Sequence, residues 1–259
     1  MKIAILGAGA FGTALGGILA DKAFDIDYYD TRIEQERLSD VISGADYILL
    51  AVPSKAVPYV LPYLPKNRPL IVATKGILSC QTFKDFKDFM VLSGPGFADD
   101  IKAGKQTKLT ASDKRIVELF TTDYLSFDYS DNNNGILMCG GLKNVYAIEA
   151  GLRNLQRDSV EWEQYIKDVC TEMKLILKAN GALSRTVDLV CGIGDLKLTC
   201  GYPSRNYEFG DKKRQNSDYQ PEKTVEGLSA LKRIMRREIV IPKTCTVMNR
   251  IIEEFEDEA

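Results

Sequence analysis

Residues 2–12 read Lys-Ile-Ala-Ile-Leu-Gly-Ala-Gly-Ala-Phe-Gly, an apolar run followed by the pattern G-x-G-x-x-G. The run predicts a buried parallel strand, and the alanine- and leucine-rich residues 10–22 predict the helix that follows it. In such a segment the first glycine permits a tight turn, the second lets the backbone approach a pyrophosphate, and the third lets the helix pack on the strand. The segment therefore predicts a dinucleotide-binding turn, with an ordinary tight turn as the alternative. The residues expected at the dinucleotide are Gly7, Gly9, Ala10, Phe11 and Gly12.

Two charged residues bear on which dinucleotide binds. Asp30 ends the second expected strand, 18 residues after Gly12. A carboxylate at this place can accept hydrogen bonds from the ribose hydroxyls, which favours NAD. Arg32 follows two residues later and can instead contact a 2′-phosphate. We therefore expect NAD or NADP, with NAD slightly favoured.

Strand and helix patterns alternate in the first half of the chain, which is typical of a doubly wound parallel sheet. We expect strands at 25–30, 46–52, 69–73, 90–93, 108–111 and 124–129, and helices at 33–43, 55–64 and 112–122. Helical periodicity dominates from Gly135, with helices expected at 137–155, 159–180, 184–191, 224–237 and 242–255. The fold class is therefore α/β, with a Rossmann-type domain at 1–130 and an all-helical substrate and catalytic domain at 131–259. The polar run 211–218 predicts a solvated, mobile loop.

The amino-acid composition excludes several classes of function and of catalytic site. The formal net charge of −2 supplies no basic field for nucleic acid or an anionic membrane surface, and no apolar run approaches the ~20 residues that span a bilayer. The sequence contains no histidine, which removes Ser-His-Asp and Cys-His catalysis and histidine metal sites, so we expect no metal. The six cysteines form no C-x-x-C pair, and no secretory signal precedes the first strand, so we expect reduced thiols in the cytoplasm.

Further motifs are more specific than the glycine turn. They are Ala-Val-Pro-Ser at 51–54, Thr-Lys-Gly at 74–76, Gly-Leu-Lys-Asn-Val-Tyr-Ala-Ile at 141–148, Gly-Ile-Gly-Asp-Leu-Lys-Leu-Thr-Cys at 192–200, Ser-Arg-Asn at 204–206 and Val-Glu-Gly at 225–227. Together with the turn, they resemble the NAD(P)-dependent glycerol-3-phosphate dehydrogenase family over nearly the whole chain.

This resemblance implies roles for individual residues. Lys143 would be the general acid that protonates the developing alkoxide, Asp195 would hold this lysine, and Thr199 would support Asp195. Lys75 would lie near the substrate oxygen. The resemblance implies substrate contacts from Asn144, Ser204, Arg205, Asn206 and Gly94, and further cofactor contacts from Val52, Pro53, Lys75, Ala98, Arg205 and Glu226.

Elementary chemistry agrees with these roles. Without histidine, a lysine whose proton affinity is lowered by the neighbouring Lys75 is a reasonable acid. The planar guanidinium of Arg205 can contact two phosphate oxygens. A lysine within the apolar helix around 143 is costly unless it has a partner or a function.

Each of these residues also has a purely structural alternative. Lys143 could extend its amine to solvent, Asp195 could cap a helix, and Arg205 could form a surface ion pair. Cys139 and Cys200 fit buried small apolar residues, and the aromatic residues around Trp162 fit helix packing.

The chain also departs from the pattern of the family. Asp46 follows Asp30 by only 16 positions, so a segment that normally borders the cofactor is missing. Asp100 replaces a glutamate, and Gly96 stands where a small polar residue is common. The link from Thr199 to Arg205 is short. These departures affect cofactor affinity and the choice between NAD and NADP more than the reaction.

The resulting hypothesis is an NAD(P)-dependent sn-glycerol-3-phosphate dehydrogenase of compact length. It would interconvert dihydroxyacetone phosphate and sn-glycerol 3-phosphate for glycerophospholipid synthesis, as a cytoplasmic enzyme and a candidate homodimer. A dehydrogenase of the hydroxyacid or 6-phosphogluconate type is one alternative, and a non-enzymatic nucleotide-binding paralogue is another.

Overall fold

The structure is a computed structural model that describes residues 1–32, 37–76 and 79–256. The chain forms two compact units. The first comprises Met1–Lys75 and Cys80–Asn133, and the second comprises Gly76–Ser79 and Asn134–Ala259. Each unit is described by itself below.

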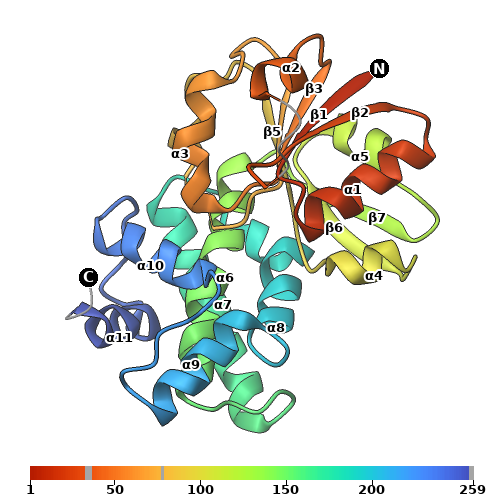
Figure 1. Cartoon of the computed structure of the whole chain (residues 1–259). Helices are drawn as coiled ribbons and strands as arrows, with labels where there is room; N and C mark the ends of the chain where they lie inside the picture. The colour runs from red at the N-terminus through yellow and green to blue at the C-terminus, as the bar shows by residue number, and fades with distance from the viewer. Residues whose placement is uncertain (33–36, 77–78, 257–259) are drawn as a thin grey trace. The chain divides into compact units, whose positions relative to one another are not determined.

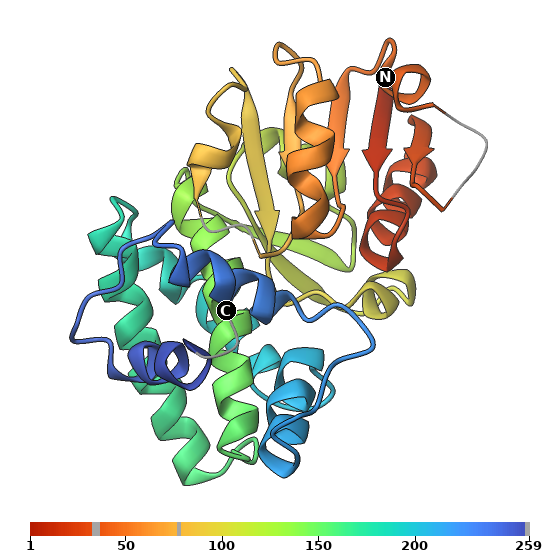
Figure 2. The same ribbon diagram turned by 60° about the vertical axis from the view of Figure 1, so that its left-hand side comes forward.

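Among the described residues, seven strands of the first unit form one sheet in the order β2-β1-β3-β4-β5-β6-β7. The strands are β1 (Lys2–Leu6), β2 (Asp25–Tyr29), β3 (Tyr47–Leu50), β4 (Leu70–Val72), β5 (Phe89–Ser93), β6 (Thr107–Ala111) and β7 (Leu125–Tyr129). Figure 2 shows β1 to β5 side by side. Neighbouring strands are parallel except β5 and β6, which pair antiparallel through Leu92 with Ala111 and Ser93 with Thr110. The predicted fold class is confirmed, with this one antiparallel pair as an addition.

Helices cover both faces of the sheet. Figure 1 shows α3 (Val57–Val60) on one side and α1 (Ala10–Asp21), α4 (Ala98–Lys102) and α5 (Lys114–Phe120) on the other. The latter three share one apolar core with the sheet, to which Ile5 and Leu15 belong. Burying such side chains contributes ~1.5–3 kcal/mol each.

Two predicted helices of this unit differ in the structure. The helix expected at 55–64 is a succession of η1 (Ser54–Ala56), α3 and η2 (Leu61–Tyr63), because Pro58 and Pro62 have no N–H to donate within a helix. Of the helix expected at 33–43, α2 (Leu38–Ile42) is observed, whereas 33–36 lie outside the described residues. A short turn, η3 (Cys80–Phe83), was not predicted.

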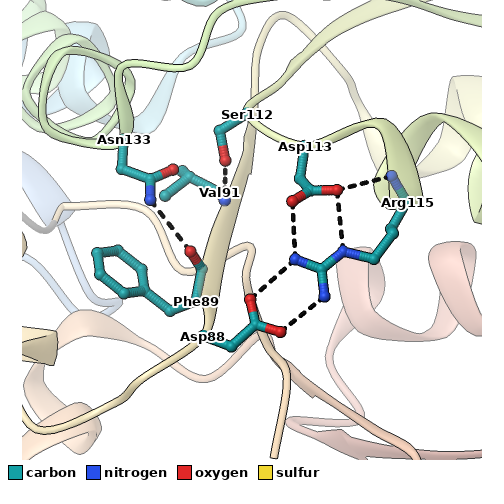
Figure 3. Close-up of polar contacts among 7 residues, drawn as sticks. All are labelled: Asp88, Phe89, Val91, Ser112, Asp113, Arg115 and Asn133. Carbon is teal, nitrogen blue, oxygen red and sulfur yellow. Dashed lines mark hydrogen bonds and ion pairs between the residues drawn. The ribbon is translucent and has the colours of Figure 1, made fainter.

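A guanidinium ties the start of β5 to the start of α5 (Figure 3). Arg115 donates to both carboxylate oxygens of Asp88 at 2.6 and 2.8 Å and to those of Asp113 at 3.0 and 2.7 Å. Asp113 also caps α5 by accepting from the Arg115 N–H. The bonds to Asp88 and then to Asp113 raise the pKa of Arg115 above its usual value. Nearby, Asn133 donates to the Phe89 carbonyl at 3.1 Å, which anchors the residue that begins α6.

The second unit is built around α6 (Asn133–Leu152), drawn in green in Figures 1 and 2. Every residue of this helix from Gly135 to Gly151 is buried, because helices pack around all of its sides. The surrounding elements are α7 (Val160–Ala179), η4 (Ser184–Asp188), the π turn η5 (Val190–Gly194), α8 (Asp195–Thr199), α9 (Arg205–Gln215), α10 (Glu226–Met235) and α11 (Thr246–Glu254).

The loop predicted at 211–218 is wrong for residues 211–215, five of its eight residues. Helix α9 continues to Gln215, and Asp211 within it is buried. Its carboxylate accepts hydrogen bonds from Tyr202, Arg214 and Gln215. The i,i+3 and i,i+4 spacing of Arg214 and Gln215 supports a helix even though the run is polar.

A buried carboxylate caps the last helix. Glu172 of α7 accepts from the Val247 N–H at 2.7 Å, the Met248 N–H at 3.1 Å and the Tyr146 hydroxyl at 3.0 Å. A carboxylate at a helix N-terminus satisfies N–H groups that have no partner within the helix and interacts favourably with the helix dipole. Burial, with the nearby Glu172, raises the pKa of Tyr146 well above its usual value, so this tyrosine stays protonated as a donor.

Replacing Glu172 with alanine should therefore lower the free energy of unfolding by about 3 kcal/mol, because three buried donors lose their acceptor. Urea unfolding followed by circular dichroism measures this change. The control is Glu163→Ala, which removes an exposed ion pair to Lys197 at 3.4 Å and should cost less than ~1 kcal/mol. Equal losses in the two variants would contradict the capping role.

Candidate functional site

The glycine turn has the geometry of a dinucleotide cradle. Gly7 has a φ of +106°, and a Cβ there would lie 2.7 Å from the Ala51 carbonyl carbon. A Cβ on Gly12 would lie 2.1 Å from the Gly7 carbonyl oxygen. A Cβ on Gly9 would meet nothing within 4 Å, so this glycine is not required by packing. Gly9 caps α1 without a side-chain acceptor, which leaves the first backbone N–H groups of the helix facing open space.

The carboxylate at the end of β2 is engaged within the protein. Asp30 accepts from the Ala8 N–H at 2.9 Å, and the guanidinium of Arg32 donates to its two oxygens at 2.7 and 2.6 Å. The Arg32 hydrogen bond is the main reason that the pKa of Asp30 falls to about 2. The Arg32 side chain is 72% exposed and that of Asp30 is 10% exposed. The arginine is therefore the more accessible partner for a ligand.

The other predicted residues of this unit follow the carboxyl ends of neighbouring strands. Val52 and Pro53 follow β3, and Thr74 donates its hydroxyl to the Val52 carbonyl at 2.9 Å. Lys75 follows β4, and its Nζ lies 5.5 Å from the centroid of the Phe11 ring. These residues therefore gather at one edge of the sheet with the glycine turn, where ligands bind in open α/β folds.

Gly94 and Ala98 lie further along the same edge. Gly94 follows β5 with a φ of +144°, and Ala98 is the first residue of α4. The structure therefore brings the predicted residues of the first unit together, from the glycine turn through Val52 and Lys75 to this loop.

The second unit contains a buried ion pair. Lys143 Nζ lies 2.5 Å from Asp195 Oδ1, and the two side chains are 3% and 1% exposed. Lys143 also donates to Thr199 Oγ1 at 3.1 Å, and Thr199 donates to the Asp195 carbonyl at 2.6 Å. Lys143 therefore does not extend to solvent. Asp195 is the first residue of α8 and caps no helix with its side chain, because Gly194 occupies the capping position.

The second carboxylate oxygen of Asp195 is a further feature of this ion pair. Among the described residues, Asp195 Oδ2 is buried and accepts no hydrogen bond. Burying two charges is costly, and their attraction offsets this cost only when the remaining lone pairs are satisfied. The pair is therefore poorly explained as a purely stabilising contact, and a functional role accounts for it better.

The predicted substrate residues divide into two groups. Asn206 donates to Asn144 Oδ1 at 2.9 Å and accepts from the Gly227 N–H at 2.9 Å. Asn144 donates in turn to the Gly140 carbonyl at 3.0 Å. These amides join α6, α9 and the start of α10, so a large part of their hydrogen-bonding capacity is used inside the unit.

Ser204 and Arg205 lie at the start of α9. Ser204 caps the helix by accepting from the Tyr207 N–H at 3.5 Å. Arg205 is exposed, and within the described part of the chain its guanidinium makes no hydrogen bond or ion pair, which leaves it accessible to a ligand. Glu226 is the half-buried first residue of α10.

The cysteines near the ion pair are buried. Cys139, Cys191 and Cys200 are 0% exposed. A hydrogen bond with Cys191, together with burial, raises the pKa of the Cys139 thiol, and burial raises that of Cys200. Trp162 donates its indole N–H to the Cys200 carbonyl at 2.6 Å and is packed in the core. Buried thiols with a raised pKa are unreactive, so Cys139 and Cys200 act as packing groups.

Known families match both halves of the chain. Residues 28–117 match the model of the NAD-dependent glycerol-3-phosphate dehydrogenase N-terminus, and 132–255 match that of its C-terminus. A glycerol-3-phosphate dehydrogenase [NAD(P)+] of Maridesulfovibrio salexigens is 30% identical over 82% of this chain and 79% of its own length. One from Leptospira biflexa is 31% identical over 81% and 78%.

The chain belongs to the NAD(P)-dependent glycerol-3-phosphate dehydrogenase family. Solved structures agree on the fold. A glycerol-3-phosphate dehydrogenase from Coxiella burnetii superposes with a TM-score of 0.77 at 24% identity, covering 98% of this chain and 94% of the other. One from Plasmodium falciparum gives 0.83 at 17% identity, covering 100% and 92%. The resemblance inferred from the motifs is thereby confirmed.

Two residues that support these sites were not among the site residues predicted from the sequence. Thr74 links the loops after β3 and β4, and its position beside Lys75 at a strand end was the available signal. Gly227 supplies the N–H that fixes Asn206, and the Val-Glu-Gly motif at 225–227 was its signal. None of the described helices is long and apolar enough to cross a membrane.

Breaking the buried ion pair should be strongly destabilising. Asp195→Asn should lower the free energy of unfolding by roughly 3–5 kcal/mol, because it removes the carboxylate that pairs with the buried Lys143 ammonium. The double variant Lys143→Met/Asp195→Leu removes both charges at similar volume and should recover most of this loss. Chemical denaturation of the wild type and the two variants measures both changes. A double variant as unstable as Asp195→Asn would contradict the view that charge burial is the cost.

Proposed function

We propose that this chain interconverts dihydroxyacetone phosphate and sn-glycerol 3-phosphate, with NAD(H) or NADP(H) as the hydride carrier. The observation that carries the proposal is the buried Lys143–Asp195 pair in a chain of this family. The alternative of a non-enzymatic paralogue does not account for a desolvated lysine that is held by a carboxylate with a spare oxygen.

The first unit fits a dinucleotide. The open space at Gly9, the φ of Gly7 and the N-terminus of α1, which has no side-chain cap, are the features that a pyrophosphate site at a helix N-terminus requires. When bound, the nicotinamide dinucleotide supplies or accepts the hydride. The proposed holding residues are Gly7, Gly9, Ala10, Phe11, Gly12, Asp30, Arg32, Val52, Pro53, Lys75, Ala98, Arg205 and Glu226.

The second unit supplies the proton. As the ketone is reduced, its oxygen gains negative charge and needs one proton. The Lys143 ammonium donates that proton, and in the reverse direction the neutral amine removes it from the alcohol. Asp195 contacts the amine at 2.5 Å and Thr199 accepts a hydrogen bond from it at 3.1 Å, and these two contacts help to position the amine. The overall reduction consumes one hydride and one proton, so charge balances.

The substrate phosphate is assigned to Arg205. Its guanidinium is exposed at the N-terminus of α9, where a dianion also interacts favourably with the helix dipole. Ser204 and Asn206 fix the backbone on either side of it through their hydrogen bonds. Lys75 is assigned to the region of the reacting oxygen, and Asn144 and Gly94 to the walls of the substrate site. A cytoplasmic location stays a prediction from the cysteine pattern, and a homodimer and a role in glycerophospholipid synthesis stay predictions as well.

The decisive assay follows NADH or NADPH oxidation with dihydroxyacetone phosphate. The wild type should turn over at roughly 1–10³ s⁻¹, and Lys143→Met should lower kcat by about 10²–10⁴-fold, because the proton donor is lost. Arg205→Ala should raise KM for the substrate by at least tenfold and KM for the dinucleotide by less, because Arg205 is one of several proposed contacts to the dinucleotide but the main proposed contact to the substrate phosphate.

The matched control is Arg185→Ala, an exposed arginine of the same unit, which should behave as the wild type. A wild type that oxidises neither dinucleotide would overturn the proposed function. Turnover with 6-phosphogluconate or a hydroxyacid instead of the triose phosphate would assign the chain to the alternative type of dehydrogenase.

The Asp30–Arg32 pair predicts a measurable cofactor preference. Arg32→Ala should raise KM for NADPH by about tenfold, since the exposed guanidinium is the group that can meet a 2′-phosphate. KM for NADH should change less than threefold or fall, because Asp30 is freed for the ribose hydroxyls. Steady-state kinetics with both dinucleotides decides the matter, and parallel losses for the two would contradict this assignment.

A further inference from the structure

The residue that pairs with Lys143 stands directly after an unusual turn. The π turn η5 (Val190–Gly194) ends immediately before Asp195, which opens α8. Single π turns are rare and occur frequently at functional sites. The placement of this turn therefore decides where the Asp195 carboxylate lies.

Gly192 of the π turn packs against the backbone of the preceding turn, η4. A Cβ on Gly192 would lie 2.2, 2.5 and 2.6 Å from the carbonyl oxygen, Cα and carbonyl carbon of Val187. All three are backbone atoms of η4 (Ser184–Asp188), where Val187 is 0% exposed. Because backbone within a packed core cannot yield as a flexible side chain can, any side chain at 192 must displace the turn.

Cys191 of the π turn makes the second contact that positions the turn. Cys191 donates toward the Thr186 carbonyl at 3.9 Å, and it lies close enough to Cys139 on α6 to raise the pKa of the Cys139 thiol. Cys139 precedes Lys143 by four residues, and Cys191 precedes Asp195 by four residues. The thiol contact and the ion pair are therefore successive links between the same two segments.

We propose that Gly192 and Cys191 are positioning residues. They set the distance between Asp195 and Lys143 by fixing where the π turn packs. This inference rests on the proposed function for its kinetic consequences. Neither residue touches the reacting atoms, and both act through the carboxylate. The charged and titratable groups that face this pair include Thr199, which accepts from the ammonium, Cys200, which interacts electrostatically with Lys143, and Cys139, which interacts electrostatically with Asp195.

The first test replaces Gly192 with alanine. We expect kcat for triose phosphate reduction to fall at least tenfold, because small displacements of catalytic groups are costly. We also expect the activity to begin to fall at a lower pH than in the wild type, since the ammonium form of Lys143 loses part of its stabilisation. KM for NADH should stay within twofold, because the glycine turn belongs to the other unit.

The second test keeps the inference falsifiable if Gly192→Ala does not fold. Cys191→Val adds volume against Cys139 and should produce the same kinetic changes, whereas Cys191→Ser, of similar size and still a donor to Thr186, should not. Adding Cys139→Ala to Cys191→Val makes room for the extra methyl group and should restore both kcat and the pH profile.

Ile251→Ala serves as the stability control, because it removes core volume from α11. This variant should lower the melting temperature without moving the pH profile. A Gly192→Ala or Cys191→Val enzyme with an unchanged pH profile, or a double variant without rescue, would overturn the inference.

Crystal structures separate this inference from the proposed function. In Gly192→Ala the distance between Lys143 Nζ and the Asp195 carboxylate should exceed the 2.5 Å of the wild type. An unchanged distance would overturn the positioning role. A wild type inactive on dihydroxyacetone phosphate would overturn the proposed function alone, since the distance can still be compared.

Discussion

Helix α6 has no face toward solvent, and this constraint determines most of the second unit. A polar side chain on such a helix cannot reach water, so it needs a partner on a neighbouring element. Lys143 finds Asp195, Asn144 finds Asn206, and Glu149 pairs with Arg250 of α11. Burial raises the pKa of Glu149, whereas Arg250 acts in the opposite direction. The three partners lie on α8, α9 and α11. The contacts that pair the polar side chains of α6 therefore also position these helices around it.

Close approach of helices makes this arrangement possible. A Cβ on Gly151 of α6 would lie 2.1 Å from the Tyr207 carbonyl oxygen, and one on Gly210 of α9 would lie 2.0 Å from the Ile148 carbonyl oxygen. The two helices therefore cross with backbone against backbone. Such contact fixes α9 relative to α6 and, with it, the place of Arg205 relative to Lys143 within the same unit.

Local features of this fold could be predicted from the sequence, and long-range features could not. Strand β1 matches its predicted bounds of 2–6, because an apolar run before a glycine turn has few other solutions. The antiparallel pairing of β5 and β6 was not predicted, since periodicity carries no strand direction. The run 211–218 was expected as a loop because its composition is polar, whereas Ser204, Arg214 and Gln215 together support a helix there.

The same distinction applies to the candidate sites. The turn at Gly7–Gly12 acts through backbone conformation, so a short pattern suffices to recognise it, but many folds with unrelated chemistry use it. The pair of Lys143 and Asp195 spans 52 residues of sequence, and no spacing rule connects them. The resemblance to the family predicted functional positions for both residues, whereas only the structure shows the π turn next to Asp195 and the buried thiols near the pair. The proposed chemistry of this chain therefore depends on contacts between segments that lie far apart in the sequence. These contacts form only when the chain folds around α6, so a single sequence reveals them poorly.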